Sequence, residues 1–289
     1  MGITQRLMNF LFRLKDKHYM KANRRLDTTE YTIKSDRLPD AFSGKKILHL
    51  SDLHQERFGE NYSILVDACR AVKPDYIFFT GDLYSRQEKS ISDKPLLMKL
   101  LKELAPVYYI PGNHEVETPE SAEALYYKLE QAGIHILRNS QARLFVGEEY
   151  INVYGLEVER KYYKNDDGRY RNLPEMKVRD VENALGKTEK GRFNMLLAHT
   201  PFPFEAYAEW GADLTFSGHC HGGIVRLPLL GGILSPERKF FPKYTKGVYS
   251  CNKYANKAKM IVSAGLGKFR LFNPAEIVVV TLEANERNV

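Results

Sequence analysis

The sequence predicts an α/β protein in which two sheets pack on each other and helices cover the outside. Three observations support this fold class. In the first half of the chain, apolar segments of strand length alternate three times with segments of helix length. In the second half, strand-like segments predominate. Polar motifs follow several predicted strands, and the carboxyl ends of strands are where α/β folds place their ligands.

The first half opens with a predicted strand at residues 31–34 and a turn at Leu38-Pro39. Three strand–helix pairs come next, and Gly133 is the expected stop of the last helix. We predict these strands and helices, in chain order, at residues 46–50, 64–72, 76–79, 96–104, 107–110 and 119–131.

The second half is expected to add the remaining strands of the two sheets. They are predicted at residues 143–146, 150–154, 193–197, 214–216, 247–250, 260–263 and 277–282. Because neither an internal repeat nor a low-complexity linker divides the chain of 289 residues, we expect one domain over residues 29–289. A separate basic segment over residues 1–28 precedes it.

The composition indicates a reducing compartment. The chain has three cysteines, Cys69, Cys220 and Cys251, and this odd, sparse count argues against a disulfide framework. It contains no run of the ~20 apolar residues that a transmembrane helix needs, and its N-terminus does not resemble a signal peptide. We therefore expect a cytoplasmic protein, with Cys220 as a structural thiol that points away from the metals described below.

Most of the net charge of +7 lies in the N-terminal segment. Residues 1–25 carry seven basic residues against the single acidic Asp16, a net of +6, and Ile3, Leu7, Leu11 and Leu14 recur at helical spacing. We expect a basic amphipathic helix that binds an anionic membrane, which would place the protein at the inner face of the membrane. The alternatives are a helix docked on the catalytic domain and, less favoured, a nucleic-acid contact.

Five short segments contain residue types that bind divalent metals. They are Ser51–His54, Gly81–Asp82, Gly112–Glu115, Ala198–His199 and Gly218–His221. Carboxylate, amide and imidazole groups are the ligands that hard and borderline metals prefer. One Asp-x-His or Gly-Asp alone carries little weight, but five segments in this order at strand ends indicate one metal site.

We assign seven residues as ligands of two metals that share one carboxylate. Asp52 and His54 are two residues apart and, in an extended segment, point to the same side. Asp82 follows a glycine, which lets the backbone turn sharply and bring this carboxylate under both metals. The first metal is assigned Asp52, His54, Asp82 and His221, and the second Asp82, Asn113, His199 and His219.

Two metals about 3.5–4 Å apart can hold the attacking and the leaving oxygens of a phosphoryl displacement. The sequence therefore predicts a metal-dependent phosphoesterase. The mixed ligand set fits Mn²⁺ or Fe, with Zn²⁺ as the alternative.

In the order Asp-x-His, Gly-Asp, Gly-Asn-His, His and Gly-His-x-His, the chain from Lys46 onward resembles the calcineurin-like metallophosphoesterase superfamily. This resemblance implies a four-layer α/β/β/α sandwich of two mixed sheets flanked by helices. It also implies two divalent metals and a bridging hydroxide that attacks phosphorus in line. For His114 it implies stabilisation of the transition state or protonation of the leaving oxygen, with a structural role as the alternative.

One departure from the superfamily narrows the function. Its protein serine/threonine phosphatases carry Asp-Arg-Gly shortly after Gly-Asp, where this chain has Ser85-Arg86-Gln87. The carboxylate that would pair with the catalytic histidine is absent there, so we exclude a phosphoprotein phosphatase. The segments at residues 218–223 and 265–277 resemble instead a bacterial subgroup of membrane-associated phosphoesterases, some of which hydrolyse UDP-2,3-diacylglucosamine. This resemblance implies cleavage of a phosphodiester or pyrophosphate bond in a small-molecule or lipid-linked substrate.

Three further segments can shape the substrate site. The apolar segment at residues 227–234 can hold an acyl chain or pack in the core, and residues 238–244 interleave basic and aromatic side chains. The basic loop at residues 160–171 is expected either to cap the site and bind phosphate groups or to be merely solvated.

Three rival functions remain open at this stage. A nuclease or a small-molecule phosphomonoesterase would use the same metals, although the basic surplus lies in the tail and not around the site. A non-catalytic metal-binding scaffold is the remote alternative, because such a protein is expected to lose ligands and every expected ligand is present here.

Overall fold

The computed structural model of the chain describes residues 25–169, 172–223, 225–227, 231–234, 240–267 and 273–285. The predicted N-terminal helix therefore lies outside the described residues, as do parts of the three segments expected to shape the substrate site. Among the described residues, no helix has the length and apolar character that are needed to cross a membrane.

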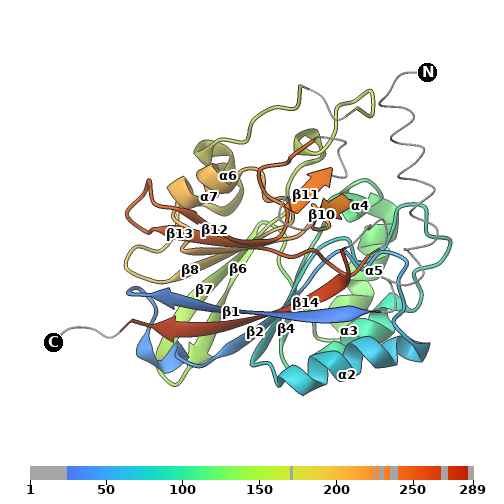
Figure 1. Cartoon of the computed structure of the whole chain (residues 1–289), viewed down its shortest axis with the longest axis horizontal. Coiled ribbons are helices and arrows are strands. Elements are labelled where there is room, and N and C mark those ends of the chain that lie inside the picture. The colour runs from blue at the N-terminus through green and yellow to red at the C-terminus, as the bar shows by residue number, and fades with distance from the viewer. Residues whose placement is uncertain are drawn as a thin grey trace.

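Two sheets of six strands pack face to face, and helices cover their outer faces (Figure 1). The strands of the first sheet are, in spatial order, β1 (Leu26–Ser35), β14 (Ala275–Ala284), β2 (Lys46–Leu50), β3 (Tyr76–Thr80), β4 (Val107–Ile110) and β5 (His135–Ile136). Strand β14 runs antiparallel to β2, whereas the other neighbours are parallel. The sheet is thus mixed, as expected.

The second sheet is also mixed. Its strands are, in spatial order, β12 (Gly247–Cys251), β13 (Ala258–Val262), β9 (Leu214–Ser217), β8 (Asn194–Ala198), β7 (Glu149–Leu156) and β6 (Ser140–Val146). The outer pairs β12–β13 and β6–β7 are antiparallel, and the central pairs are parallel. A separate hairpin is formed by β10 (Val225–Leu227) and β11 (Gly231–Leu234).

The helices complete the four layers of the α/β/β/α sandwich. One outer layer consists of α2 (Ser63–Val72), α3 (Lys94–Lys102) and α5 (Pro119–Gln131), and the other of α6 (Val178–Leu185) and α7 (Phe204–Trp210). The short helix α4 (Asn113–Val116) follows β4 directly. Single 3-10 turns lie at Asp40–Phe42, Glu60–Tyr62 and Arg160–Tyr162.

Alternation along the central strands explains why their sequences are almost wholly apolar. In β3, Ile77 and Phe79 face the core beneath the helices, whereas Phe78 faces the core between the two sheets. The Phe78 ring lies edge-on to Phe216 of β9, with the ring centroids 5.0 Å apart. Parallel strands that are covered on both faces show such continuous apolar runs, so the sandwich is encoded in the strand sequences themselves.

The expected strands are all present, and the structure adds elements that the periodicity did not reveal. Strand β1 is longer than the predicted 31–34, and the expected domain boundary at residues 28 and 29 lies within it. The helices α6 and α7 were missed because they are short and lie in a region that reads as strand-rich. The segment at residues 227–234 contributes to the β10–β11 hairpin, with residues 228–230 outside the described part of the chain.

Candidate metal centre

The expected metal ligands come from both sheets and meet at the carboxyl ends of their strands. Asp52 and His54 follow β2, Asp82 follows β3, and Asn113 and His114 open α4 after β4. The second sheet supplies the remaining histidines from the ends of β8 and β9, namely His199, His219 and His221. The Asp52, Asp82 and His199 side chains are at most 2% exposed, whereas those of His221 and His114 are 11% and 16% exposed.

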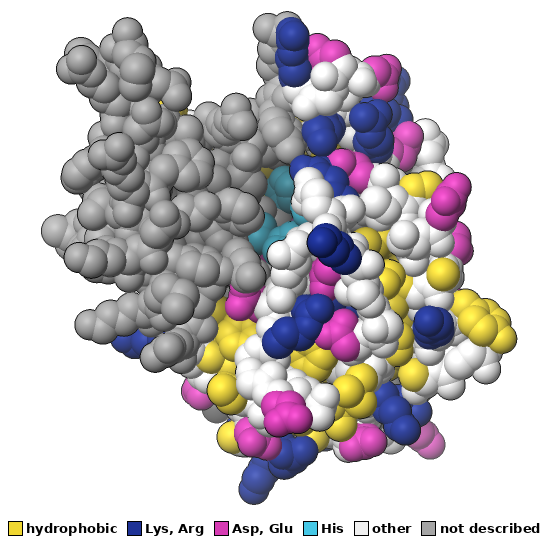
Figure 2. Space-filling view, turned by 90° about the vertical axis from the view of Figure 1, so that its right-hand side faces the viewer, with side chains coloured by type: hydrophobic (Ala, Val, Ile, Leu, Met, Phe, Trp, Pro, Cys, Tyr) yellow, Lys and Arg dark blue, Asp and Glu magenta, His cyan; other side chains and the backbone are white. Residues whose placement is uncertain are grey.

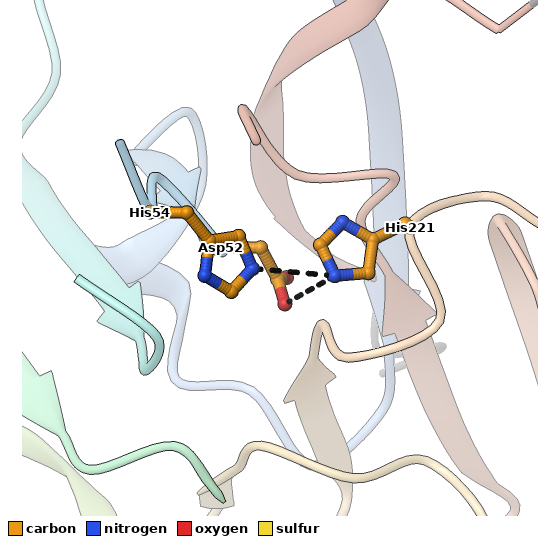
Figure 3. A group of neighbouring side chains, drawn as sticks. All are labelled: Asp52, His54 and His221. Carbon is orange, nitrogen blue, oxygen red and sulfur yellow. Dashed lines mark hydrogen bonds and ion pairs between the residues drawn. The ribbon is translucent and has the colours of Figure 1, made fainter. Parts of the chain in front are cut away.

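The first group of expected ligands consists of Asp52, His54 and His221 (Figure 3). The Nε2 atom of His221 lies 3.6 Å from Oδ1 of Asp52 and 3.3 Å from Nε2 of His54. The two imidazole rings are stacked with their planes 17° apart. Three donor atoms therefore converge on one point from two different sheets.

The second group lies on the other side of Asp82. Nε2 of His199 is 3.4 Å from Oδ2 of Asp82 and 3.2 Å from Oδ1 of Asn113. Nδ1 of His219 is 2.9 Å from the same Asn113 oxygen. Because Oδ2 of Asp82 is also 3.7 Å from Nε2 of His54, this carboxylate lies between the two groups.

These distances fit bound divalent ions. Nitrogen and oxygen ligands bind such ions at about 2.0–2.2 Å, so two ligands of one ion lie roughly 3–3.5 Å apart. The donor atoms named above are separated by 2.9–3.7 Å. The chemistry of the set, carboxylate and amide oxygens with imidazole nitrogens, is likewise that of a metal site.

Left-handed backbone conformations bring the expected ligands together. The spacing argument assumed extended segments, but φ is 53° at Asp52 and at His54, and 66° and 49° at His219 and His221. Asp82 also has φ of 53°. Left-handed backbone is uncommon for residues other than glycine and costs of order 1–3 kcal/mol where the surroundings enforce it. The convergence is therefore a property of tight turns at the strand ends and not of residue alternation.

Two of the motif glycines are required by close approach of neighbouring backbone or side chains. At Gly81, where φ is 87°, a Cβ atom would lie 2.5 Å from the backbone nitrogen of Gly112. At Gly218 a Cβ atom would lie 1.9 Å from Oγ of Ser51 and 2.3 Å from Oδ2 of Asp52. The glycines of Gly-Asp and Gly-His-x-His thus allow the ligand loops to touch.

Glu115 is a buried residue of the centre to which the sequence analysis gave no role. Its carboxylate accepts backbone N–H groups from Asp82, Leu83 and Gly112 at 3.0, 2.8 and 2.8 Å. It therefore ties the loop after β3 to the loop after β4. Its position directly after Asn113-His114 was the only sign in the sequence that Glu115 belongs to the centre. The sequence does not show whether a carboxylate at this position binds a metal or backbone N–H groups.

Backbone groups orient two histidines of the centre. Nδ1 of His199 lies 2.6 Å from the carbonyl oxygen of Thr80, so it donates to this carbonyl and Nε2 faces Asp82. Nδ1 of His114 accepts the backbone N–H of Arg86 at 2.9 Å, which leaves the ring proton of a neutral imidazole on Nε2. This Nε2 atom is 3.8 Å from Oδ2 of Asp82.

Charge interactions inside the centre are strong because water is excluded. Burial raises the pKa of Asp82, but the neighbouring His114 and His199 outweigh burial and hold this pKa well below its usual value. For His199 burial lowers the pKa, but the Asp82 and Asp52 carboxylates and a hydrogen bond to Asp82 raise it to about 9. Burial lowers the pKa of His114. Without metal, His199 therefore carries a proton at neutral pH.

The segment after β7 lies against the metal centre. The Tyr163 ring packs 5.2 Å from the His219 ring and 6.0 Å from the His199 ring, measured between centroids. The next residue, Lys164, places Nζ 3.3 Å from Oε2 of Glu117, which also forms an ion pair with Arg86. Part of the loop expected to cap the site thus contacts it. Figure 2 shows histidine side chains at the surface near basic and acidic groups.

Cys69, Cys220 and Cys251 form no disulfide, and Cys220 is wholly buried between the two expected ligands His219 and His221.

Comparisons with known proteins give a consistent result. The model of the family described as calcineurin-like phosphoesterase matches residues 45–223. Relatives from Bacillus subtilis are the uncharacterized metallophosphoesterases YkuE, 30% identical over 90% of this chain and 86% of that protein, and YkoQ, 27% identical over 86% and 87%. A zebrafish transmembrane protein with a metallophosphoesterase domain is 26% identical over 86% of this chain and 55% of its own length.

Among solved structures, that of the sulfate thiohydrolase SoxB of Thermus thermophilus is similar, and the superposition covers 85% of this chain and 57% of the SoxB chain. The TM-score is 0.49 and the sequence identity is 14%.

The pKa of His199 predicts that metal binding depends on pH. Because the pKa of His199 is raised to about 9, binding of a metal ion at pH 7 must displace a proton from the imidazole. As the pH approaches 9, fewer molecules carry this proton and less of it has to be displaced. We expect the affinity for Mn²⁺ to rise about tenfold per pH unit from pH 7 to about 9 if one proton is released. Isothermal titration calorimetry in buffers of different ionisation enthalpy measures the proton release. Affinity and heat that are the same in all buffers and at all pH values would contradict it.

Proposed function

This chain belongs to the calcineurin-like phosphoesterase family and is a hydrolase of phosphoester bonds, and we propose that it cleaves a phosphodiester or pyrophosphate bond with two divalent metals. The observation that carries this proposal is the position of Asp82, whose Oδ2 lies between the donor atoms of His54 and His199 at 3.7 and 3.4 Å. A carboxylate between two sets of ligands is what a pair of metals requires.

The two sets of residues would hold one ion each. Asp52, His54 and His221 would hold the first ion, Asn113, His199 and His219 the second, and Asp82 both. Such ions, when bound, neutralise charge on phosphoryl oxygens and make water acidic enough to attack at neutral pH. Mn²⁺, Fe or Zn²⁺ fits this ligand set.

His114 would stabilise the developing charge as a hydrogen-bond donor. Because its Nδ1 accepts the N–H of Arg86, protonation of both ring nitrogens would place two N–H groups against each other. The ring is thus held neutral, with the Nε2 proton on the side of Asp82. Between the two roles implied by the resemblance, this geometry favours a hydrogen bond to the transition state over protonation of the leaving oxygen.

The substrate would be a small or lipid-linked phosphoester that enters beside the segment after β7. Glu117 holds the side chains of Arg86 and Lys164 next to the residues that support His114, and cations so placed can bind the anionic oxygens of a phosphate group. The backbone N–H of Arg86 orients His114, and the guanidinium of the same residue is held by Glu117. Binding of the substrate by this guanidinium would therefore be linked to the orientation of His114.

The protein would act in the cytoplasm at an anionic membrane surface. The basic amphipathic segment at residues 1–25 supports this, and the zebrafish relative is named as a transmembrane protein. Two adjacent aromatic side chains, Phe240 and Phe241, are 58% and 66% exposed, and Lys243 follows them. Exposed aromatic rings with neighbouring cations are typical of membrane interfaces.

Hydrolysis by the metal-stripped chain reloaded with Mn²⁺ tests the proposed function. We expect turnover of bis-p-nitrophenyl phosphate that exceeds turnover of p-nitrophenyl phosphate. Asp82→Asn should reduce turnover at least about a thousandfold, because the loss of a shared ligand removes several kcal/mol of transition-state stabilisation. Preference for the monoester would indicate a phosphomonoesterase. Turnover of neither compound would support the non-catalytic scaffold.

The proposed role of His114 predicts a loss of turnover without a loss of metal. His114→Ala should lower kcat about 10²–10³-fold, the usual effect of removing one preorganised donor. The bound Mn²⁺, measured by mass spectrometry of the desalted protein, should be unchanged. A variant that loses metal in proportion to activity would show that His114 is a ligand and not a donor to substrate.

The membrane proposal predicts that residues 1–25 carry vesicle binding. Deletion of these residues leaves β1 intact from Leu26 and should reduce binding to anionic vesicles at least about a hundredfold, because each basic residue contributes roughly 1 kcal/mol. Replacement of Ile3, Leu7 and Leu11 by Ser keeps the charge and tests the apolar face. Equal sedimentation of the full and shortened chains with vesicles would rule the proposal out.

A further inference from the structure

A lysine with no exposed surface lies at the start of α3, directly behind the first group of expected ligands. The side chain of Lys94 is 0% exposed. A buried lysine is rare unless it is paired, because its ammonium must be taken out of water. The first residue of a helix is moreover a poor place for a cation, since the helix dipole is positive there. The preferences of the helix start therefore do not explain a buried lysine at this position, so the explanation must lie in the contacts of its side chain.

The ammonium group of Lys94 binds the first ligand loop. Its Nζ atom donates to the backbone carbonyl of His54 at 2.5 Å. His54 has φ of 53°, so this bond fixes a carbonyl in a strained stretch of backbone. The bond sets the direction of the peptide that follows a ligand, and hence the position from which the His54 imidazole reaches toward Asp82 and His221.

The same ammonium group is linked to the second ligand loop through Glu88. Nζ of Lys94 lies 3.3 Å from Oε1 of Glu88, whose side chain is 5% exposed. The other oxygen of Glu88 accepts the backbone N–H of Ser85, three residues after Asp82, at 3.1 Å. Lys94 thus joins the loop that carries His54 to the loop that carries Asp82.

Three further side chains extend this cluster from the buried Lys94 and Glu88 to the partly exposed Arg57 and Asp93. Arg57 of the first ligand loop pairs with Glu88 at 2.7 Å and with Asp93 at 2.5 Å, and Tyr62 donates to Asp93 at 2.6 Å. Two cations therefore face two carboxylates, so the cluster is balanced in charge. The Lys94–Glu88 pair is the buried part of this cluster, and removal of one partner of a buried pair leaves an uncompensated charge.

We propose that Lys94 is a positioning residue of the metal centre: it locks the His54 and Asp82 loops in the arrangement that binds the ion shared by Asp52, His54, Asp82 and His221. This inference rests on the two-metal centre proposed above. Lys94 touches neither metal nor substrate and acts through the His54 carbonyl and Glu88. Replacement of a residue that contacts a metal ligand, but not the metal, typically changes metal affinity 10–100-fold.

The test measures binding of Mn²⁺ alone to the full chain. Lys94→Met removes the donor and the charge and keeps the length of the side chain, and Lys99→Met on the exposed face of α3 is the matched control. Lys94→Gln retains a donor for the His54 carbonyl, and it carries the test if Lys94→Met does not fold. Calorimetry gives the affinity of each site, and electron paramagnetic resonance distinguishes a coupled Mn²⁺ pair from a single ion.

We expect the Mn²⁺ site that contains His54 to weaken 10–100-fold in Lys94→Met. The other site shares only Asp82 with it and should weaken by a clearly smaller factor. The coupled signal should give way to that of a single ion at limiting Mn²⁺. Lys94→Gln should lose less affinity, and Lys99→Met none.

Three outcomes would overturn the positioning role. These are wild-type affinity at both sites in Lys94→Met, equal weakening of both sites, and failure of both Lys94 variants to fold, which would make Lys94 a residue of general stability. The failure of the proposed function is distinguishable. It would appear in the wild-type chain itself, either as the absence of a second Mn²⁺ or as a bound pair without hydrolysis.

Discussion

The geometry of the centre depends on one constraint: loops from two sheets must approach a single buried carboxylate, that of Asp82. The backbone reaches this point only through left-handed conformations at several of the converging residues and through contacts that leave no room for a Cβ atom at Gly81 and Gly218. Such strained backbone conformations persist only where several contacts of the surrounding structure hold them in place. The Glu115 carboxylate does so by binding three backbone N–H groups of the loops after β3 and β4.

The packing of the two sheets is also needed to bring these loops together. The first sheet carries Asp52, His54, Asp82 and Asn113, and the second carries His199, His219 and His221. Neither sheet alone holds all of the residues that we propose as ligands of two ions. The centre therefore exists only when the sheets are packed, and the core between them, with Phe78 against Phe216, fixes their separation.

The sequence was sufficient for the parts of the molecule that obey a repeating pattern. The strands β2, β3 and β4 and the motifs behind them could be predicted because buried strands are apolar throughout and ligands follow strand ends. The buried contacts of Glu115 and Lys94 with backbone groups could not be predicted, because a charged residue at a helix start gives no sign that it is buried there. The extended geometry expected at Asp52 and His54 was wrong for a related reason. Their convergence depends on tight turns, and spacing alone does not distinguish a turn from an extended segment.

Charge balance explains how so polar a centre can be buried at all. Asp52 and Asp82 are almost without solvent contact, and two carboxylates in such a place require positive charge nearby. In the absence of metal, the proton on His199 supplies part of it, in keeping with the raised pKa of His199 and the lowered pKa of Asp82. A divalent ion would replace this proton and bind the same carboxylates more strongly. The residues that would hold the ions are thus also those whose charges balance one another within the centre.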